Sequence, residues 1–184
     1  MKNIYVPALG ALSLLLAGCG NADEPGGTAE ATSTAGKSDL AATIGEIDEL
    51  STANEVIANA GLEDPFNGAG SYTIFLPDNE AFAQLPEGEL ERLRSEEGRP
   101  GVVAILRTHI AVGAIAREDL DEALDLNGGS IELASVADEP ISIHKVDGQI
   151  FVGDGDDAPR LTNVARSASN GVVYVIDGFI PPRS

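Results

Sequence analysis

Apolar residues recur every three or four positions at the start of the region that follows residue 37. They are Leu40, Ile44, Ile47 and Leu50. This spacing places them on one side of a helix. A second short helix is predicted directly afterwards, because Thr52 and Glu55 have the spacing of a capping box and Gly61 supplies a C-terminal stop.

A strand that turns into a helix is predicted next. Residues 72–76 are rich in aromatic and β-branched side chains, and Pro77 ends the run because proline cannot donate to a β-ladder. Asp78 can accept a hydrogen bond from a free amide in the first turn of a helix that carries Ala81 and Phe82. The Pro-Asp pair is therefore interpreted as a corner from strand to helix.

Two further helices are predicted before the pattern changes. The first is a charged helix near residues 88–95. Pro100 suits the first position of the second, longer helix, which would carry Val103, Leu106 and Ile110 on one face.

Short β-like runs separated by Gly, Asp and Asn follow Gly113. They span residues 131–134, 141–146, 149–153 and 172–176. The Asp147-Gly148 pair predicts a hairpin between the second and third runs. Helices first and strands later predict an α+β domain, in which helices pack at one side of a largely antiparallel β unit.

The first residues have the layout of an export signal. Lys2 gives a weakly positive start, and a mostly apolar run over residues 4–17 ends in small residues of the kind that precede a cleavage site. The run is too short to cross a hydrocarbon core of about 30 Å comfortably, and the polar sequence after it resembles no stop-transfer pattern. We predict a signal peptide over residues 1–18, with a permanent anchor as the alternative.

The cleavage region at the end of this signal, Leu16-Ala17-Gly18-Cys19, resembles the bacterial lipobox, in which the cysteine sulfur is acylated and the chain is cleaved just before it. The resemblance implies that Cys19 becomes a lipid-bearing N-terminus, and several acyl chains give stable anchoring. Gly20 stands where inner-membrane lipoproteins often have Asp, which favours the outer membrane, on its periplasmic or surface face. The alternative is an ordinary secretory cut that leaves a free cysteine.

The rest of the chain is predicted to be a tether and one domain. Residues 19–37 form the lipidated cysteine and a flexible tether, because the segment after Cys19 has no large apolar residue. Residues 38–184 have the length of a single domain. The single cysteine excludes a disulfide within the chain.

Acidic residues outnumber basic ones by 30 to 11, for a formal net charge of −19. Such a chain repels phosphate backbones, and few aromatic side chains are available to stack on bases. Nucleic-acid binding is therefore not expected, and solubility is the simplest reason for the acidity.

Three segments, residues 72–82, 105–113 and 169–177, resemble boxes of the fasciclin-like (FAS1) domain family. Their order and spacing cover nearly all of residues 38–184. The residues that carry the likeness, which we expect to be structural, are Thr73, Phe75, Pro77, Asp78, Ala81, Phe82, His109, Gly113, Asn170, Gly171, Tyr174 and Asp177.

The resemblance implies a FAS1-like β-wedge of two sheets with helices packed alongside. It also implies a role in extracellular adhesion or protein–protein contact, with a protein or matrix polymer as partner, no cofactor and no catalysis. Val112 stands where the family often has Pro, and Tyr174 stands where it often has His. Neither departure threatens the implied fold, but both weaken the carry-over of any family binding role built on those side chains.

The two histidines do not indicate catalysis or zinc binding. His109 shares a predicted helical face with Leu106 and Ile110, so we interpret it as a core histidine with satisfied hydrogen bonds rather than a base. His144 lies on a predicted strand and is expected to be exposed. No cysteine is available to complete a zinc site.

Clustered carboxylates make Asp154, Asp156 and Asp157 candidates for calcium, which prefers such oxygens. The EF-hand pattern is absent, and Asp and Gly are also the residues that a solvated turn requires. We interpret the segment as a turn and keep a small-ligand or calcium-binding envelope lipoprotein as the alternative function. Neither a nucleophile elbow nor a phosphate loop is present in the sequence, so no enzyme is predicted.

Overall fold

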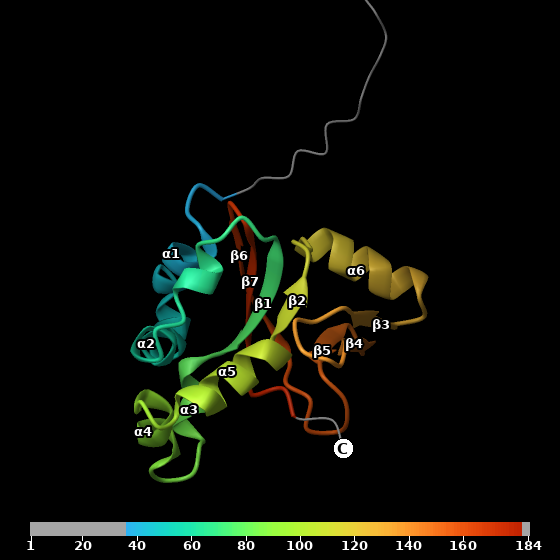
Figure 1. Cartoon of the computed structure of the whole chain (residues 1–184). Coiled ribbons are helices and arrows are strands. Elements are labelled where there is room, and N and C mark those ends of the chain that lie inside the picture. Colours follow the sequence, from blue (N-terminus) through green and yellow to red (C-terminus); the bar gives the residue numbers. More distant parts are fainter. Residues whose placement is uncertain (1–35, 182–184) are drawn as a thin grey trace, which may run out of the picture. The chain divides into compact units, whose positions relative to one another are not determined.

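The computed structural model describes residues 36–181 (Figure 1). The predicted signal peptide (1–18), Cys19 and the tether up to residue 35 lie outside the described residues. The helices are α1 (Leu40–Gly45), α2 (Ser51–Asn59), α3 (Asn79–Ala83), α4 (Glu89–Arg94), α5 (Arg99–Thr108) and α6 (Arg117–Leu126), with 3₁₀ turns η1 (Asp48–Leu50) and η2 (Asp64–Phe66). Between residues 36 and 181, no helix is long and apolar enough to span a membrane.

Seven strands form two sheets in this part of the chain. They are β1 (Tyr72–Pro77), β2 (Ile110–Val112), β3 (Ser130–Leu133), β4 (Ile141–Val146), β5 (Gln149–Val152), β6 (Leu161–Ala168) and β7 (Gly171–Ile176). The first sheet has the order β2-β1-β7-β6 and the second the order β3-β4-β5. Only the β1–β7 pair is parallel, and the other neighbouring strands in these sheets are antiparallel. The predicted α+β fold with two sheets is confirmed.

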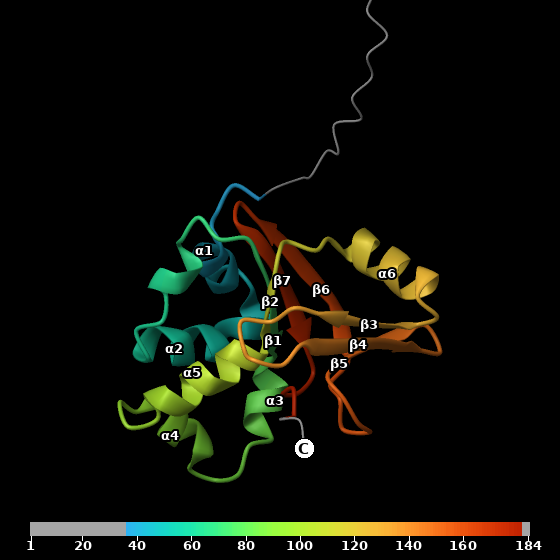
Figure 2. The same ribbon diagram turned by 45° about the vertical axis from the view of Figure 1, so that its right-hand side comes forward.

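The four-stranded sheet carries a hydrophobic core on each face. Because side chains alternate along a strand, Ile74 and Val175 point into the first core, while Phe75 and Tyr174 point into the second. Helices α1 to α5 cover the first face, and α6 with the three-stranded sheet covers the second (Figures 1 and 2). The central strands are therefore apolar on both faces.

Several local predictions are confirmed. Asp78 caps α3 by accepting a hydrogen bond from the amide of Ala81 at 2.8 Å. Asp147 and Gly148 have φ angles of 51° and 79°, as a two-residue turn between β4 and β5 requires. Gly61, with a φ of 63°, follows the end of α2.

Helix α6 and strand β6 were not predicted from the sequence, and neither was the short turn η2. Helix α6 lies within a stretch interpreted as loop and strand, because Leu120 and Leu124 are its only fully apolar inward positions among many acidic residues. Strand β6 was missed because a bulge between Leu161 and Ala165 interrupts its alternation.

Three details of the helix predictions were wrong. The first predicted helix, which was to carry Leu40 through Leu50, ends at Gly45, and Leu50 lies in the separate turn η1. The amide of Thr52 is bound by the Oδ1 atom of Asn79, at 2.9 Å, so the cap of α2 comes from another helix and not from a capping box. Helix α5 ends before His109, and Ile110 begins β2 instead of continuing the helix. Pairing of β2 with β1 favours the extended backbone there.

Candidate functional site

Polar side chains of the family-like segments join elements that are far apart in the sequence. Thr73, fully buried in β1, donates from Oγ1 to the carbonyl of Gly113 at 2.8 Å and accepts from the amide of Ile115 at 2.9 Å. The hydroxyl of Tyr174 in β7 donates to the carbonyl of Ile115 at 3.0 Å. Thr73 and Tyr174 together hold the loop that follows β2 against the sheet.

Phe75 and Tyr174 stack in the second core. Their ring centroids are 5.5 Å apart with the planes at 15°, and both residues are inaccessible to solvent. Burial raises the pKa of the Tyr174 hydroxyl, which keeps it a neutral donor. Tyr174, at the position where the family often has His, is thus an interior contact rather than a surface one.

The predicted strand-to-helix corner packs onto the C-terminal segment. Pro77 is the last residue of β1, and the amide of Asp78 donates to the carbonyl of Ile176. Ala81 and Phe82 are buried on α3. The Phe82 ring meets Phe179 edge-on at 5.0 Å.

His109 connects the end of α5 to the C-terminal segment. Its Nδ1 atom lies 2.7 Å from the carbonyl oxygen of Ile105, and its Nε2 atom lies 3.0 Å from the amide nitrogen of Ile180. Because a carbonyl only accepts and an amide only donates, the proton is on Nδ1 and Nε2 is the acceptor. Burial lowers the pKa of His109 to about 4, although the bond to Ile105 acts in the opposite direction. Neither ring nitrogen is free to take a proton from a substrate.

Asn170 satisfies three backbone groups at once. Its Oδ1 atom accepts from the amide of Leu40 at 2.8 Å. Its Nδ2 atom donates to the carbonyls of Phe66 and Gly68 at 2.7 and 3.0 Å. The side chain therefore fixes the start of α1 and the loop before β1 against the β6–β7 turn.

Gly171 and Asp177 lie at the two ends of β7. A Cβ atom on Gly171 would overlap the carbonyl oxygen of Tyr72, so the close approach of β1 requires glycine. Asp177 binds Arg160 twice, accepting from its amide and from its Nε atom, both at 2.7 Å. Gly171 therefore allows the backbone of β1 to approach, and Asp177 fixes the backbone at Arg160.

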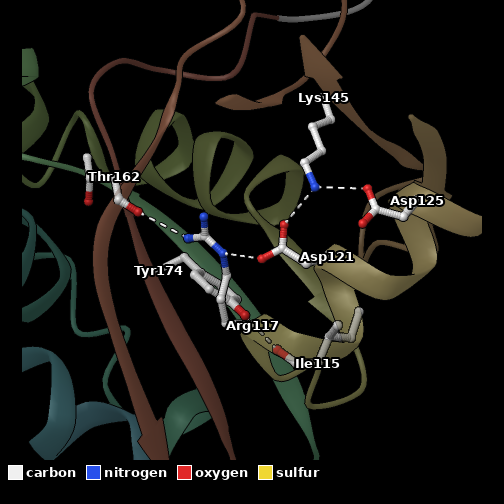
Figure 3. Close-up of polar contacts among 7 residues, drawn as sticks. All are labelled: Ile115, Arg117, Asp121, Asp125, Lys145, Thr162 and Tyr174. Carbon is white, nitrogen blue, oxygen red and sulfur yellow. Dashed lines mark hydrogen bonds and ion pairs between the residues drawn. The ribbon is translucent and has the colours of Figure 1, made fainter. Parts of the chain in front are cut away.

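A charged network links α6 to the two sheets (Figure 3). Arg117 donates to Asp121 at 3.0 Å and to the carbonyl of Thr162 at 3.3 Å. Lys145 contacts Asp121 at 3.3 Å and Asp125 at 2.9 Å. Burial acts to raise the pKa of Asp121, but the hydrogen bonds from Arg117 and Lys145 outweigh it, so the pKa lies below its usual value.

A polar depression of about 450 Å³ lies beside this network, with Arg117 and Arg160 in its wall. Both guanidinium groups already bind a carboxylate of the chain, Asp121 and Asp177 respectively. A ligand anion would have to compete with these partners. The depression is therefore a weak candidate for binding.

The acidic loop and His144 have no arrangement suited to a metal. Asp154, Asp156 and Asp157 are exposed in the bend after β5. Among the residues that the structure describes, no three His, Cys, Asp or Glu side chains gather closely enough to hold an ion. His144 is half-buried because it stacks on its cross-strand neighbour Phe151 at 5.3 Å, so its predicted exposure was only partly right.

A hydrophobic depression of about 270 Å³, hereafter the apolar groove, is the feature that sequence reasoning missed. Its walls come from η2 with the loop before it, β1, α5, β2 and the segment after β3, and they consist of Leu62, Phe66, Tyr72, Val103, Leu106, Arg107, Ile110 and Val136. The residues spread over five separate segments. The one local signal was Arg107, which stands one helical turn after Val103 of the predicted apolar face.

Known proteins resemble this chain over most of its described part. A family model described as the fasciclin domain matches residues 48–182. Protein sll1483 of Synechocystis sp. is 34% identical over 123 residues, which are 67% of this chain and 62% of that protein. Stabilin-2 of Mus musculus is 30% identical over 71% of this chain and 4% of its own length.

A solved structure shares the fold. It is the FAS1 domain pair from the insect cell adhesion molecule Fasciclin I, with a TM-score of 0.68, 15% identity, and coverage of 80% of this chain and 52% of that chain. The chain thus spans less than two thirds of the length of each of these relatives. The family match over residues 48–182 shows that the chain belongs to the fasciclin domain family.

Proposed function

We propose that this protein is a lipid-anchored, extracytoplasmic module that binds a protein or matrix polymer and has no catalytic activity. The observation that carries the proposal is the fasciclin domain itself, a fold also found in an insect cell adhesion molecule. Buried polar side chains such as Thr73 and His109 bind backbone atoms of the domain, so they stabilise the fold and leave partner contact to the surface.

The absence of catalysis is supported by the state of the candidate groups. Both ring nitrogens of His109 are engaged by backbone atoms, and burial keeps the ring neutral. Arg117 and Arg160 are held by carboxylates of the chain. A general base or an anion clamp would need at least one such group to face a substrate.

Envelope anchoring is supported by the sequence around Cys19. An apolar run followed by Leu16-Ala17-Gly18-Cys19 fits export and lipidation, and Gly20 fits transfer to the outer membrane. The tether would let the domain reach a partner without fixing its orientation to the bilayer.

The interaction role is tested by in-cell crosslinking and an attachment assay. Cells that lack the gene are compared with the same cells carrying the full chain, on surfaces and in mixed culture. We expect complementation to restore attachment and to yield a crosslinked species that contains this chain. Equal attachment with and without the gene across several growth conditions, together with an absence of crosslinked species, would contradict the role.

The anchor is tested by Cys19→Ala in the full chain, with Ser33→Ala as a control in the predicted tether. We expect Cys19→Ala to shift the protein from the detergent phase to the aqueous phase on phase separation, while Ser33→Ala stays in the detergent phase. The acyl mass should be present in the control and missing in Cys19→Ala. Unchanged partitioning of Cys19→Ala would refute lipidation.

A further inference from the structure

The apolar groove continues onto an exposed residue of the sheet edge. In the register of β1 and β2, Tyr72 lies opposite Val112 and Ile74 lies opposite Ile110. Val112 is therefore on the same face as Ile110, which lines the groove. It is 54% exposed, so the groove and Val112 form one hydrophobic surface on this side of the domain.

Arg107 is the charged residue at this surface. Its Nη2 atom lies 3.4 Å from the carbonyl oxygen of Val136, and the side chain is otherwise exposed. The ion pairs between described residues involve Arg92, Arg94, Arg117, Lys145 and Arg160. The Arg107 guanidinium thus lies at the border of the apolar groove. Within the described residues, its contacts do not include a carboxylate.

The composition of this surface matches that of protein-binding hot spots. Phe, Tyr and Arg are enriched in protein interfaces relative to the rest of the surface, and hot-spot side chains fill well-packed pockets of the interface. The groove offers Phe66 and Tyr72 as walls and Arg107 at the border. On a chain with a net charge of −19, this is a local site where a carboxylate is attracted rather than repelled.

We propose that the apolar groove, together with Val112 and Arg107, is the surface through which this domain binds its protein partner. This inference rests on the proposed function. The partner segment places an apolar side chain in the groove and a carboxylate against Arg107. Since Val103 and Arg107 are one helical turn apart, about 6 Å, a partner helix with its apolar and acidic residues three or four positions apart fits the spacing.

A displayed peptide library tests the chemistry of the partner. The purified full chain is the bait, and selected peptides are sequenced and resynthesised for binding measurements. We expect the selected peptides to share an apolar residue with Asp or Glu three or four positions away. Selection of peptides that lack a carboxylate, or of none at all, would overturn the proposal.

Charge reversal tests the place of binding. Arg107→Glu is compared with Arg99→Glu, because Arg99 is also exposed on α5 but does not line the groove. We expect Arg107→Glu to weaken binding of a selected peptide by about tenfold or more, and Arg99→Glu to change it by less than about twofold. A peptide with Lys in place of its acidic residue should bind Arg107→Glu better than it binds the wild type. Equal weakening of peptide binding by Arg107→Glu and Arg99→Glu would contradict the placement of the binding site in the groove.

Two controls address other occupants of the groove. Val103→Ser should also weaken peptide binding, and its melting curve shows whether the domain remains folded. If dodecanoate, but no peptide, competes for the groove, or if Arg107→Glu converts a dimer to a monomer, the occupant is a lipid carboxylate or a second copy and the proposal is wrong. In cells, loss of attachment on gene deletion but not in Arg107→Glu would reject the groove and leave the proposed function standing.

Discussion

His109, Asn170 and Thr73 each use their hydrogen-bonding groups on backbone atoms of another segment. His109 reaches Ile180, Asn170 reaches Leu40, and Thr73 reaches the loop after β2. A backbone amide or carbonyl in a loop has no ladder partner of its own, so leaving it unpaired on burial costs free energy. These three side chains therefore determine where the irregular segments of the domain lie.

We expect His109 to make the stability of the domain depend on pH. Its pKa is about 4 in the folded domain, against an ordinary value of 6.5. Between these values the unfolded chain binds more protons, so lowering the pH favours unfolding. The stabilisation is fully present above about pH 6.5 and decreases by about 3 kcal/mol as the pH falls to about 4.

The measurement is denaturant unfolding at several pH values for the wild type and His109→Gln. Other groups titrate in the same range, so the readout is the difference between the two stability profiles. The wild type should lose more stability on acidification than the variant does. Parallel profiles would show that His109 is not a neutral ring held by two hydrogen bonds in the folded domain.

Asn170→Asp separates the acceptor of Asn170 from its donors. The carboxylate can still accept from Leu40, but it faces the carbonyls of Phe66 and Gly68 without a proton to donate. We expect a loss of about 1 to 3 kcal/mol in the free energy of unfolding. Asn163→Asp, which adds the same charge at an exposed position of β6, is the control and should be nearly neutral. If Asn170→Asp and Asn163→Asp destabilise the domain equally, the added charge alone, and not the lost hydrogen-bond donors, explains the effect.

At the scale of elements, helices and strands of this domain are completed by their neighbours. Helix α2 begins next to η1 without a side-chain cap of its own. The Oδ1 atom of Asn79 binds the amide of Thr52, and its Nδ2 atom donates to the carbonyl of Asp48, both at 2.9 Å. Glu55, assigned in the sequence to a capping box, binds Arg94 at 2.6 Å instead.

Alanine substitutions distinguish the two caps. Asn79→Ala should lower the free energy of unfolding by about 1 kcal/mol, as the loss of an N-cap does. Thr52→Ala should change it by less than about 0.5 kcal/mol. Urea unfolding at neutral pH gives both values. A larger loss of stability for Thr52→Ala than for Asn79→Ala would instead support a capping box between Thr52 and Glu55.

At the scale of the whole domain, the four-stranded sheet joins two hydrophobic cores. Strands β1 and β7 supply side chains to both faces, so neither core keeps its wall if the sheet is lost. Two cores that share a wall are expected to unfold together in one transition.

Phe75→Ala tests this coupling from the second core. Phe75 is inaccessible and stacks on Tyr174, so truncation leaves a cavity and should cost about 3 to 5 kcal/mol. The transition should remain single, with an unchanged dependence on denaturant. Phe151→Ala, at a half-buried ring, should cost less. A near-neutral shift for Phe75→Ala, or a second transition, would contradict the shared-wall arrangement.

The parts of the fold that were predictable depend on neighbours in the sequence. The strand over residues 72–76, the Asp78 cap and the Asp147-Gly148 turn are each determined within a few residues, by side-chain alternation, hydrogen bonding or positive φ.

What the sequence alone determined was the class of fold, its family-like boxes and most element positions, because local patterns and apolar periodicity are properties of contiguous residues. Only the tertiary structure decided the cap on α2, the register that makes residues 161–168 a strand, and the apolar groove with Arg107 at its border. Each of these depends on side chains from segments far apart in the sequence, and their proximity is set by packing rather than by any short pattern.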